Sequence, residues 1–314
     1  MKRCTFFIWM MVLIPFSLFS FSLYFEQIGE YEDNAVYTDV EVFGKYAFLL
    51  AGSKGVHIFD VSNPYFPKKI SVVESMGYSY AVDVKGFYLY IADGLGGLRI
   101  FDIRDKSKPE QISFMLTGDK ALDLDVFGDY CFVAGGKGGL LTIDISKSFF
   151  PNEISVWKES EYVNSIEVVQ DYAFFSDKKG ILSLLTSGAP DSLDKYERIS
   201  ELGPVKEMVS DGSFLFAALV GGGLLVIDIS NISHPLSQEL PDKYGRIEDM
   251  FISGFYLYVV QDGRLEVFNM LVPFNPYSSG NLSTVAEVYA VSVVGHFVYA
   301  ACGIDGFRIF RISD

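Results

Sequence analysis

The sequence repeats itself with a period of 42 residues, and this period constrains the fold more than any other feature. Every repeat contains two aromatic residues separated by one small or aliphatic residue, or by Cys. The pairs are Tyr46/Phe48, Tyr88/Tyr90, Tyr130/Phe132, Tyr172/Phe174, Phe214/Phe216, Tyr256/Tyr258 and Phe297/Tyr299. Successive pairs lie 42 residues apart, except for the last step of 41. A fixed period of this length indicates seven copies of one supersecondary unit.

Each repeat has the pattern of four short strands. A Gly stands two residues before each aromatic pair, apart from Gln170 in the fourth repeat, and supplies the backbone freedom of a tight hairpin. An alternating segment such as Val40-Glu41-Val42 precedes this turn. A second Gly-rich turn, an apolar segment and a more polar segment follow the pair. The sequence therefore predicts an all-β fold, a seven-bladed β-propeller of four-stranded antiparallel blades. A β-solenoid is the alternative, but its rungs are usually shorter.

The two ends of the chain complement each other. The last repeat stops after its third strand, whereas residues 24–31 form a strand-like segment ahead of the first repeat. We expect residues 23–34 to supply the outer strand of the seventh blade, which closes the ring and leaves no unpaired blade edge. The propeller then spans residues 23–314, with repeats that start near residues 35, 78, 119, 161, 203, 245 and 286.

Residues 1–22 have the pattern of a signal peptide. Lys2 and Arg3 precede an apolar run over residues 5–21, and Ser20-Phe21-Ser22 places small residues where a signal peptidase cleaves. The mature chain is then predicted to begin at Leu23. An uncleaved membrane anchor is the alternative, because the run is nearly long enough to span a bilayer. In either case we expect an extracytoplasmic protein, which is secreted, periplasmic or on the cell surface.

The third strand and its turn carry a recurring signature. It reads VHIFDVSNP at residues 56–64 and recurs at residues 98–103 and 224–231. Together with YLYIADG at residues 88–94, it resembles the LVIVD-repeat family of β-propellers over residues 35–314. The pattern departs in the fourth repeat, at residues 184–186, and in the last two, at Asn269 and Arg311. The resemblance implies a propeller with an exported or surface location, but no established activity.

Two features that could suggest a metal ladder or a disulfide have structural explanations. The third strand ends in Asp60, Asp102, Asp144 and Asp228. An Asp in this place is expected to accept hydrogen bonds from its own turn rather than to bind a metal. Cys131 and Cys302 fall in different repeats and at different places within them. We expect two free, buried thiols, because a disulfide needs Cα atoms within about 7 Å.

Acidic residues recur in the first strand of the repeats, which would line the central channel. Five residues before the turn Gly stand Asp39, Asp123, Glu207 and Asp249, and near three residues before it stand Glu41, Asp83, Asp125 and Glu167. A spacing of two places both sets on one side of their strands. These carboxylates could hold a hard cation such as calcium. The simpler alternative, which we favour, is that they bond to backbone groups of adjacent blades or hydrate the channel.

The loops between blades contain aromatic residues that we expect to be exposed to solvent. We expect them to form one rim beside the early channel acids, and they supply Tyr78, Tyr80, Tyr162, Tyr244 and Arg246. Tyrosine among small polar residues is typical of recognition surfaces. This rim is the predicted place of partner contact, although solvated loops would have a similar composition.

No constellation of residues identifies a reaction. His57, His234 and His296 fall at unrelated places in different repeats, and neither a nucleophile elbow nor a zinc signature is present. The formal charge of −15 argues against nucleic acid as a partner.

We therefore expect a non-catalytic, monomeric recognition or scaffold module at the cell envelope or outside the cell. Its partner would be a protein or an envelope component, with membrane contact only through an uncleaved N-terminal segment. No cofactor is expected, apart from the calcium hypothesis for the channel acids. The alternative is a hydrolase or lyase that uses carboxylates at the channel mouth, with or without a divalent cation.

Overall fold

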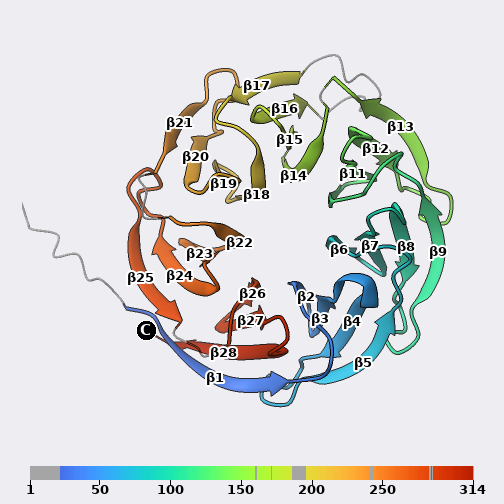
Figure 1. Cartoon of the computed structure of the whole chain (residues 1–314), viewed down its shortest axis with the longest axis vertical. Coiled ribbons are helices and arrows are strands. Elements are labelled where there is room, and N and C mark those ends of the chain that lie inside the picture. Colours follow the sequence, from blue (N-terminus) through green and yellow to red (C-terminus); the bar gives the residue numbers. More distant parts are fainter. Residues whose placement is uncertain are drawn as a thin grey trace, which may run out of the picture.

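Seven four-stranded antiparallel sheets surround a central axis in the computed structural model (Figure 1). The structure describes residues 22–159, 161–170, 172–185, 196–240, 244–282, 284 and 286–313. The prediction of a seven-bladed propeller of four-stranded blades is thus confirmed. The predicted signal peptide falls almost entirely outside the described residues.

The strands follow the chain from the axis outward in each blade. Blade 1 contains β2 (Asp39–Phe43), β3 (Tyr46–Leu50), β4 (Val56–Asp60) and β5 (Lys68–Val73). Blade 2 contains β6 (Ala81–Lys85), β7 (Tyr88–Ala92), β8 (Leu98–Asp102) and β9 (Glu110–Met115). Blade 3 contains β10 (Asp123–Phe127), β11 (Tyr130–Ala134), β12 (Leu140–Asp144) and β13 (Asn152–Trp157). Blade 4 contains β14 (Val163–Val169), β15 (Tyr172–Asp177), β16 (Ile181–Leu185) and β17 (Tyr196–Ser200).

The remaining blades have the same order, with one exception in the last. Blade 5 contains β18 (Val205–Ser210), β19 (Phe214–Leu219), β20 (Leu224–Asp228) and β21 (Leu236–Glu239). Blade 6 contains β22 (Ile247–Ser253), β23 (Tyr256–Gln261), β24 (Arg264–Asn269) and β25 (Tyr277–Leu282). Blade 7 contains β26 (Ala290–Val294), β27 (Phe297–Ala301), β28 (Phe307–Ser313) and, as its outer strand, β1 (Tyr24–Tyr31). A short 3-10 helix, η1 (Gly52–Lys54), connects β3 to β4.

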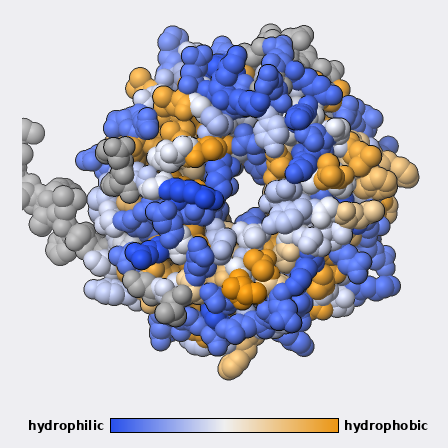
Figure 2. Space-filling view, viewed as in Figure 1, coloured by the Kyte–Doolittle hydropathy of each residue, from blue (hydrophilic) through white to orange (hydrophobic). Residues whose placement is uncertain are grey.

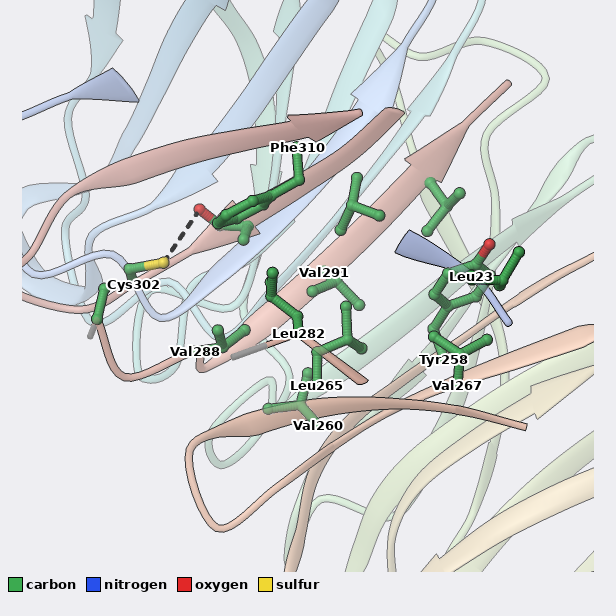
Figure 3. Packing of buried hydrophobic residues seen from close by; sticks show 14 residues of the cluster. Leu23, Tyr258, Val260, Leu265, Val267, Leu282, Val288, Val291, Cys302 and Phe310 are labelled. Atoms are coloured by element: carbon green, nitrogen blue, oxygen red, sulfur yellow. Dashed lines mark hydrogen bonds between the residues drawn. The ribbon is translucent and has the colours of Figure 1, made fainter. Parts of the chain in front are cut away.

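The hydrophobic core lies between the blades. The buried apolar residues form seven clusters, and each joins two neighbouring blades. The second aromatic residue of every repeat belongs to this core: Phe48, Tyr90, Phe132, Phe174, Phe216, Tyr258 and Tyr299, all at most 5% exposed. Figure 3 shows the cluster between blades 6 and 7, in which Leu23 packs near Tyr258 and Val267. The repeated aromatic pairs therefore form the fold rather than a binding platform.

The N-terminal strand closes the ring as predicted. β1 pairs antiparallel with β28, and Arg308 of β28 forms an ion pair with Glu30 at 2.8 Å and another with Glu32. A Cβ built on Gly306 would lie 2.2 Å from the carbonyl oxygen of Tyr31. In blade 1, a Cβ built on Gly55 would come equally close to the backbone of the outer strand, β5. β1 therefore occupies the place that an outer strand has in the other blades.

The two faces of the ring carry different loops. We call one the hairpin face, because it bears the turns between the first two strands of the blades and, in blades 1, 2, 3, 5 and 6, the turns between the last two strands. Hydrogen bonds join these turns: the N–H of Val61 donates to the carbonyl of Lys45 at 2.9 Å, and that of Met270 to Phe255 at 2.8 Å. The opposite face, the mouth face, bears the loops between blades. Each first strand runs from the mouth face to the hairpin face.

The turn residues of the signature are structural. Oδ1 of Asp60, Asp102, Asp144 and Asp228 accepts the backbone N–H two residues on, at 2.8 to 2.9 Å. Oδ1 of Asn269 accepts the N–H of Leu271 at 2.9 Å in the same way. The turn is therefore retained, although Asn269 departs from the signature. In blade 4, Gln170 replaces the hairpin Gly and takes its left-handed backbone, with φ 54°.

The remaining structural expectations concern thiols and helices. Cys131 and Cys302 are free and buried, as expected. In the part of the chain that the structure describes, no helix has the length and apolar character needed to cross a membrane.

Candidate binding site at the channel mouth

The first strands of the blades bring the eight predicted acids together around the channel. Asp39, Asp123, Glu207 and Asp249 lie at the mouth end, where a cavity of about 600 Å³ opens. Glu41, Asp125 and Glu167 line a deeper cavity of about 240 Å³. Figure 2 shows the hollow at the centre of the ring, with mostly hydrophilic residues around it.

Half of these acids hold neighbouring blades together. The backbone N–H of Val126 donates to Asp83 at 2.9 Å, that of Ile166 to Asp123 at 2.9 Å, and that of Val168 to Asp125 at 2.6 Å. The N–H of Val291 donates to Asp249 at 2.7 Å in the same way. Each bond joins the inner strand of one blade to that of the next. For these four acids, the structural alternative predicted above is confirmed.

The acids are less ionised than their number suggests. Burial raises the pKa of Asp39 to about 6, and burial together with the nearby Asp39 and Asp83 raises that of Glu41 to about 8. The pKa values of Asp123 and Asp125 rise to about 7, mainly because of burial. Burial and neighbouring carboxylates also hold the pKa values of Glu207 and Asp249 well above their usual range. The channel therefore keeps protons at neutral pH that an incoming cation would displace.

The mouth cavity receives one side chain from the same position of every blade. This position lies six residues before the hairpin turn Gly, or before Gln170 in blade 4. It is occupied by Thr38, Tyr80, Leu122, Asn164, Lys206, Glu248 and Tyr289. The positions that form the fold repeat one type of residue from blade to blade, whereas this one varies from apolar to charged. A ring of varied side chains on the regular propeller backbone can present a specific surface to a ligand.

Negative groups outnumber positive groups in this cavity. Its carboxylates are Asp39, Asp123, Glu207, Glu248, Asp249 and Glu287, and its basic residues are Lys206 and Arg246. Both basic side chains already interact with Glu248. Lys206 donates to the backbone carbonyl of Glu248 at 2.6 Å, and Arg246 lies 3.4 Å from the carboxylate of Glu248.

Aromatic rings complete the cavity on its other side. Tyr78 and Tyr80 lie with their ring centroids 4.8 Å apart, and both side chains are exposed. The hydroxyl of Tyr289, from blade 7, donates to Glu287 at 3.2 Å. Carboxylates beside tyrosine faces suit a positively charged group, which gains from both charge and cation–π contact.

The structure corrects part of the predicted rim. Tyr78, Tyr80 and Arg246 line the cavity as expected, and Tyr162 is half-buried beside Gly136. The expectation of an exposed Tyr244 is wrong. Its side chain is 3% exposed and packs against Phe268 with centroids 4.9 Å apart. The reason is that the chain ahead of β22 turns this ring inward, into the core between blades 5 and 6.

Among the charged and aromatic lining residues, the sequence patterns missed four: Lys206, Glu248, Glu287 and Tyr289. A register argument could have found three of them, since Lys206, Glu248 and Tyr289 share the repeat position of Tyr80. Glu287 occupies the repeat position of Tyr78.

The part of the chain that the structure describes places no metal-binding constellation at the cavity. No three His, Cys, Asp or Glu side chains come together there in a way that could hold a metal ion. His57 belongs to a separate network in blade 1, where its Nδ1 lies 2.8 Å from the hydroxyl of Tyr37. Burial lowers the pKa of His57 to about 4, so the ring is neutral. The calcium hypothesis stays a prediction.

Comparison with known proteins identifies the repeat. The family model of the LVIVD repeat matches residues 37–73, 76–117, 118–156 and 203–239. No protein of curated function matches the sequence.

Two solved structures are similar in fold. The computationally designed Ika8 protein has a TM-score of 0.67 at 11% identity, over 91% of this chain and 99% of its own. PorZ, a bacterial surface component of the type-IX secretion system of Porphyromonas gingivalis, has a TM-score of 0.65 at 13% identity, over 91% of this chain. This chain spans 37% of the PorZ chain. At these identities, the likeness shows the fold alone.

Proposed function

This chain is an LVIVD-repeat β-propeller, and we propose that it is a non-catalytic, exported recognition module that binds a positively charged group of a partner protein in its channel mouth. The observation that carries the proposal is the mouth cavity of about 600 Å³, to which the seven blades contribute six different residue types at one repeat position. A rigid ring offers such a surface with little loss of conformational entropy on binding.

The charge of the cavity favours a Lys or Arg side chain as the group that enters it. Six carboxylates and two basic residues line the space; Arg246 is ion-paired with Glu248, and Lys206 donates to the backbone carbonyl of Glu248. Asp39, Asp123, Glu207 and Asp249 line both the mouth cavity and the deeper one. Glu207 is the best suited of them to meet the ligand, because the other three accept backbone N–H groups. Tyr78 and Tyr80 would cover the aliphatic part of the entering side chain.

The arrangement of the acids supports binding over hydrolysis. A carboxylate pair for glycoside chemistry must be free to donate and accept a proton. Asp123 and Asp249 instead accept backbone bonds from the next blade. Export is supported by the N-terminal pattern of residues 1–22 and by the location that the family resemblance implies.

Calorimetric titration with a tetra-arginine peptide tests the proposal. We expect binding that weakens as salt is added, because exposed charges are screened. In Glu207→Gln the dissociation constant rises by about three- to tenfold, the loss expected for one partly buried charge contact. A tetraglutamate peptide does not bind.

Glu201→Gln is the matched control, since Glu201 is exposed and lies outside the mouth cavity. Equal weakening by both substitutions, or the absence of peptide binding at low salt, contradicts the proposal. Turnover of glycosides or lactones that Asp39→Asn abolishes would support the hydrolase alternative instead. Heat on titration with Ca²⁺, with a higher melting temperature, would support the calcium hypothesis.

A further inference from the structure

Large apolar side chains are exposed at the tips of the hairpin face. Beside the turn Gly of five first hairpins stand Phe43, Phe87, Phe127, Phe255 and Val294, each at least 40% exposed. An isolated exposed Phe needs no explanation, but five of the seven first hairpins expose an apolar residue directly before or after the turn Gly. The proposed binding at the mouth does not account for these residues.

The second set of turns on this face adds more apolar surface. These turns expose Tyr65, Phe66, Phe149, Phe150, Leu271 and Val272. Phe66 and Phe150 are 78% and 79% exposed and occupy the same place in blades 1 and 3. The backbone bonds between the two sets of turns place both on one face of the ring.

Lysine residues lie among the aromatic residues in blades 1 to 3. They are Lys45, Lys68, Lys85, Lys106, Lys108 and Lys147. The carboxylates of Asp60, Asp102 and Asp144 in the same turns are engaged by backbone N–H groups. Aromatic tips among lysines are typical of surfaces that enter the interfacial region of a bilayer.

The N-terminal segment leaves the ring on the same face. Tyr24, at the start of β1, pairs with Ser313 at the end of β28. The adjacent Ile312 donates its N–H to the carbonyl of His296 in the first hairpin of blade 7, at 2.8 Å. Figure 1 shows the start of β1 beside the C-terminal end. The chain therefore enters the propeller at the hairpin face, where β1 begins.

From these observations we infer that the hairpin face docks on a phospholipid membrane that contains anionic headgroups. The phenylalanine side chains enter the interfacial region, and the lysines of blades 1 to 3 contact phosphate groups. An N-terminal segment that stays uncleaved reaches the bilayer from this face without crossing the ring. The mouth face points away from the membrane, where a partner can reach the acidic cavity.

Sedimentation with phospholipid vesicles tests the inference. All the strands of the seven blades lie between Tyr24 and Ser313, so a protein that begins at Leu23 retains the complete ring. We expect this protein to bind vesicles of mixed anionic and zwitterionic phospholipid, and to bind less at high salt. The double variant Phe66→Ser and Phe150→Ser partitions about tenfold more weakly, because binding scales with the apolar area that enters the interface.

A matched double variant on the other face serves as control. Met76 and Leu95 are 79% and 70% exposed on the mouth face. Met76→Ser with Leu95→Ser keeps vesicle binding, and unchanged melting temperatures show that all variants fold. Absence of vesicle binding overturns the inference, as does an equal loss in both double variants. Self-association in solution that disappears in Phe66→Ser and Phe150→Ser would show that the face binds a second copy instead.

Discussion

Glu41 and Asp123 both face the channel, but their roles in the structure differ. Asp123 accepts backbone N–H groups from Leu124 of its own strand and from Ile166 of the next blade. The pKa of Glu41 rises to about 8 through burial and two neighbouring acids, and no hydrogen bond is among the causes of its shift. Asp123 thus links two neighbouring blades, whereas ionisation of Glu41 destabilises the folded protein.

Replacing Glu41 with Gln should change how stability depends on pH. The pKa of Glu41 is about 8 in the folded protein and near 4.5 in the unfolded chain. Between these values the folded state binds more protons, so the free energy of unfolding falls as pH rises. Glu41→Gln removes this fall and raises the free energy of unfolding at pH 8 by roughly 1–3 kcal/mol.

Denaturant unfolding at pH 5 and pH 8 measures the effect of Glu41→Gln. The exposed Glu153 provides the control, because Glu153→Gln should leave the curve unchanged. A Glu41→Gln protein that loses as much stability between pH 5 and pH 8 as the parent would contradict the assignment.

At the residue scale, the sequence located the channel acids but not their bonding. A spacing of two residues on one strand is enough to place Asp39 and Glu41 on one side. Whether a carboxylate meets a backbone N–H depends on how the next blade is set against it, over 43 residues along the chain for Asp123 and Ile166. Tyr244 was misplaced for the same reason, since loop composition does not show which way a ring turns.

At the element scale, β1 is the strand that makes the ring complete. Phe25 and Ile28 pack against the clusters on the two sides of blade 7, and Tyr31 contacts Phe59 of blade 1 with centroids 4.9 Å apart. Arg308 and Arg311 of β28 form ion pairs with glutamates of β1. Without β1, the edge of β28 would be unpaired.

Removal of β1 should therefore open the propeller. A protein that begins at Asp33 loses several half-buried apolar side chains, and its free energy of unfolding falls by roughly 5 kcal/mol or more. The free edge of β28 also promotes self-association. Thermal melting and gel filtration measure both effects. The protein that begins at Leu23 should match the full-length chain in melting temperature, and equal stability of the two truncated proteins would contradict the role of β1.

At the scale of the whole molecule, the core is a closed chain of interfaces. Seven clusters join seven blades, so each blade is stabilised from two sides. In an open array of repeats, the terminal units have one neighbour and unfold more easily. Closure removes this difference, and the ring should unfold as one unit.

Substitutions in distant interfaces test this cooperativity. Phe48 lies in the cluster between blades 1 and 2, and Phe216 in the cluster between blades 5 and 6; both are fully buried. Phe48→Ala and Phe216→Ala should each lower the free energy of unfolding by about 3–5 kcal/mol. Calorimetry should show one transition in both variants, at a lower temperature. Two separate transitions in either variant would show that the blades unfold independently.

The sequence by itself determined the number of blades, the four strands in each and the strand that closes the ring. The blades and their strands follow from local physics, because the period of the turns and the alternation of side chains act within one repeat. The closing strand follows from the count of strands, since the last repeat lacks a fourth strand and residues 24–31 precede the first repeat. Only the tertiary structure decided which acids bond across blades, which loop residues face the mouth and which apolar tips share a face. Those relations join residues from different blades, and they exist only once the seven repeats are fixed around one axis.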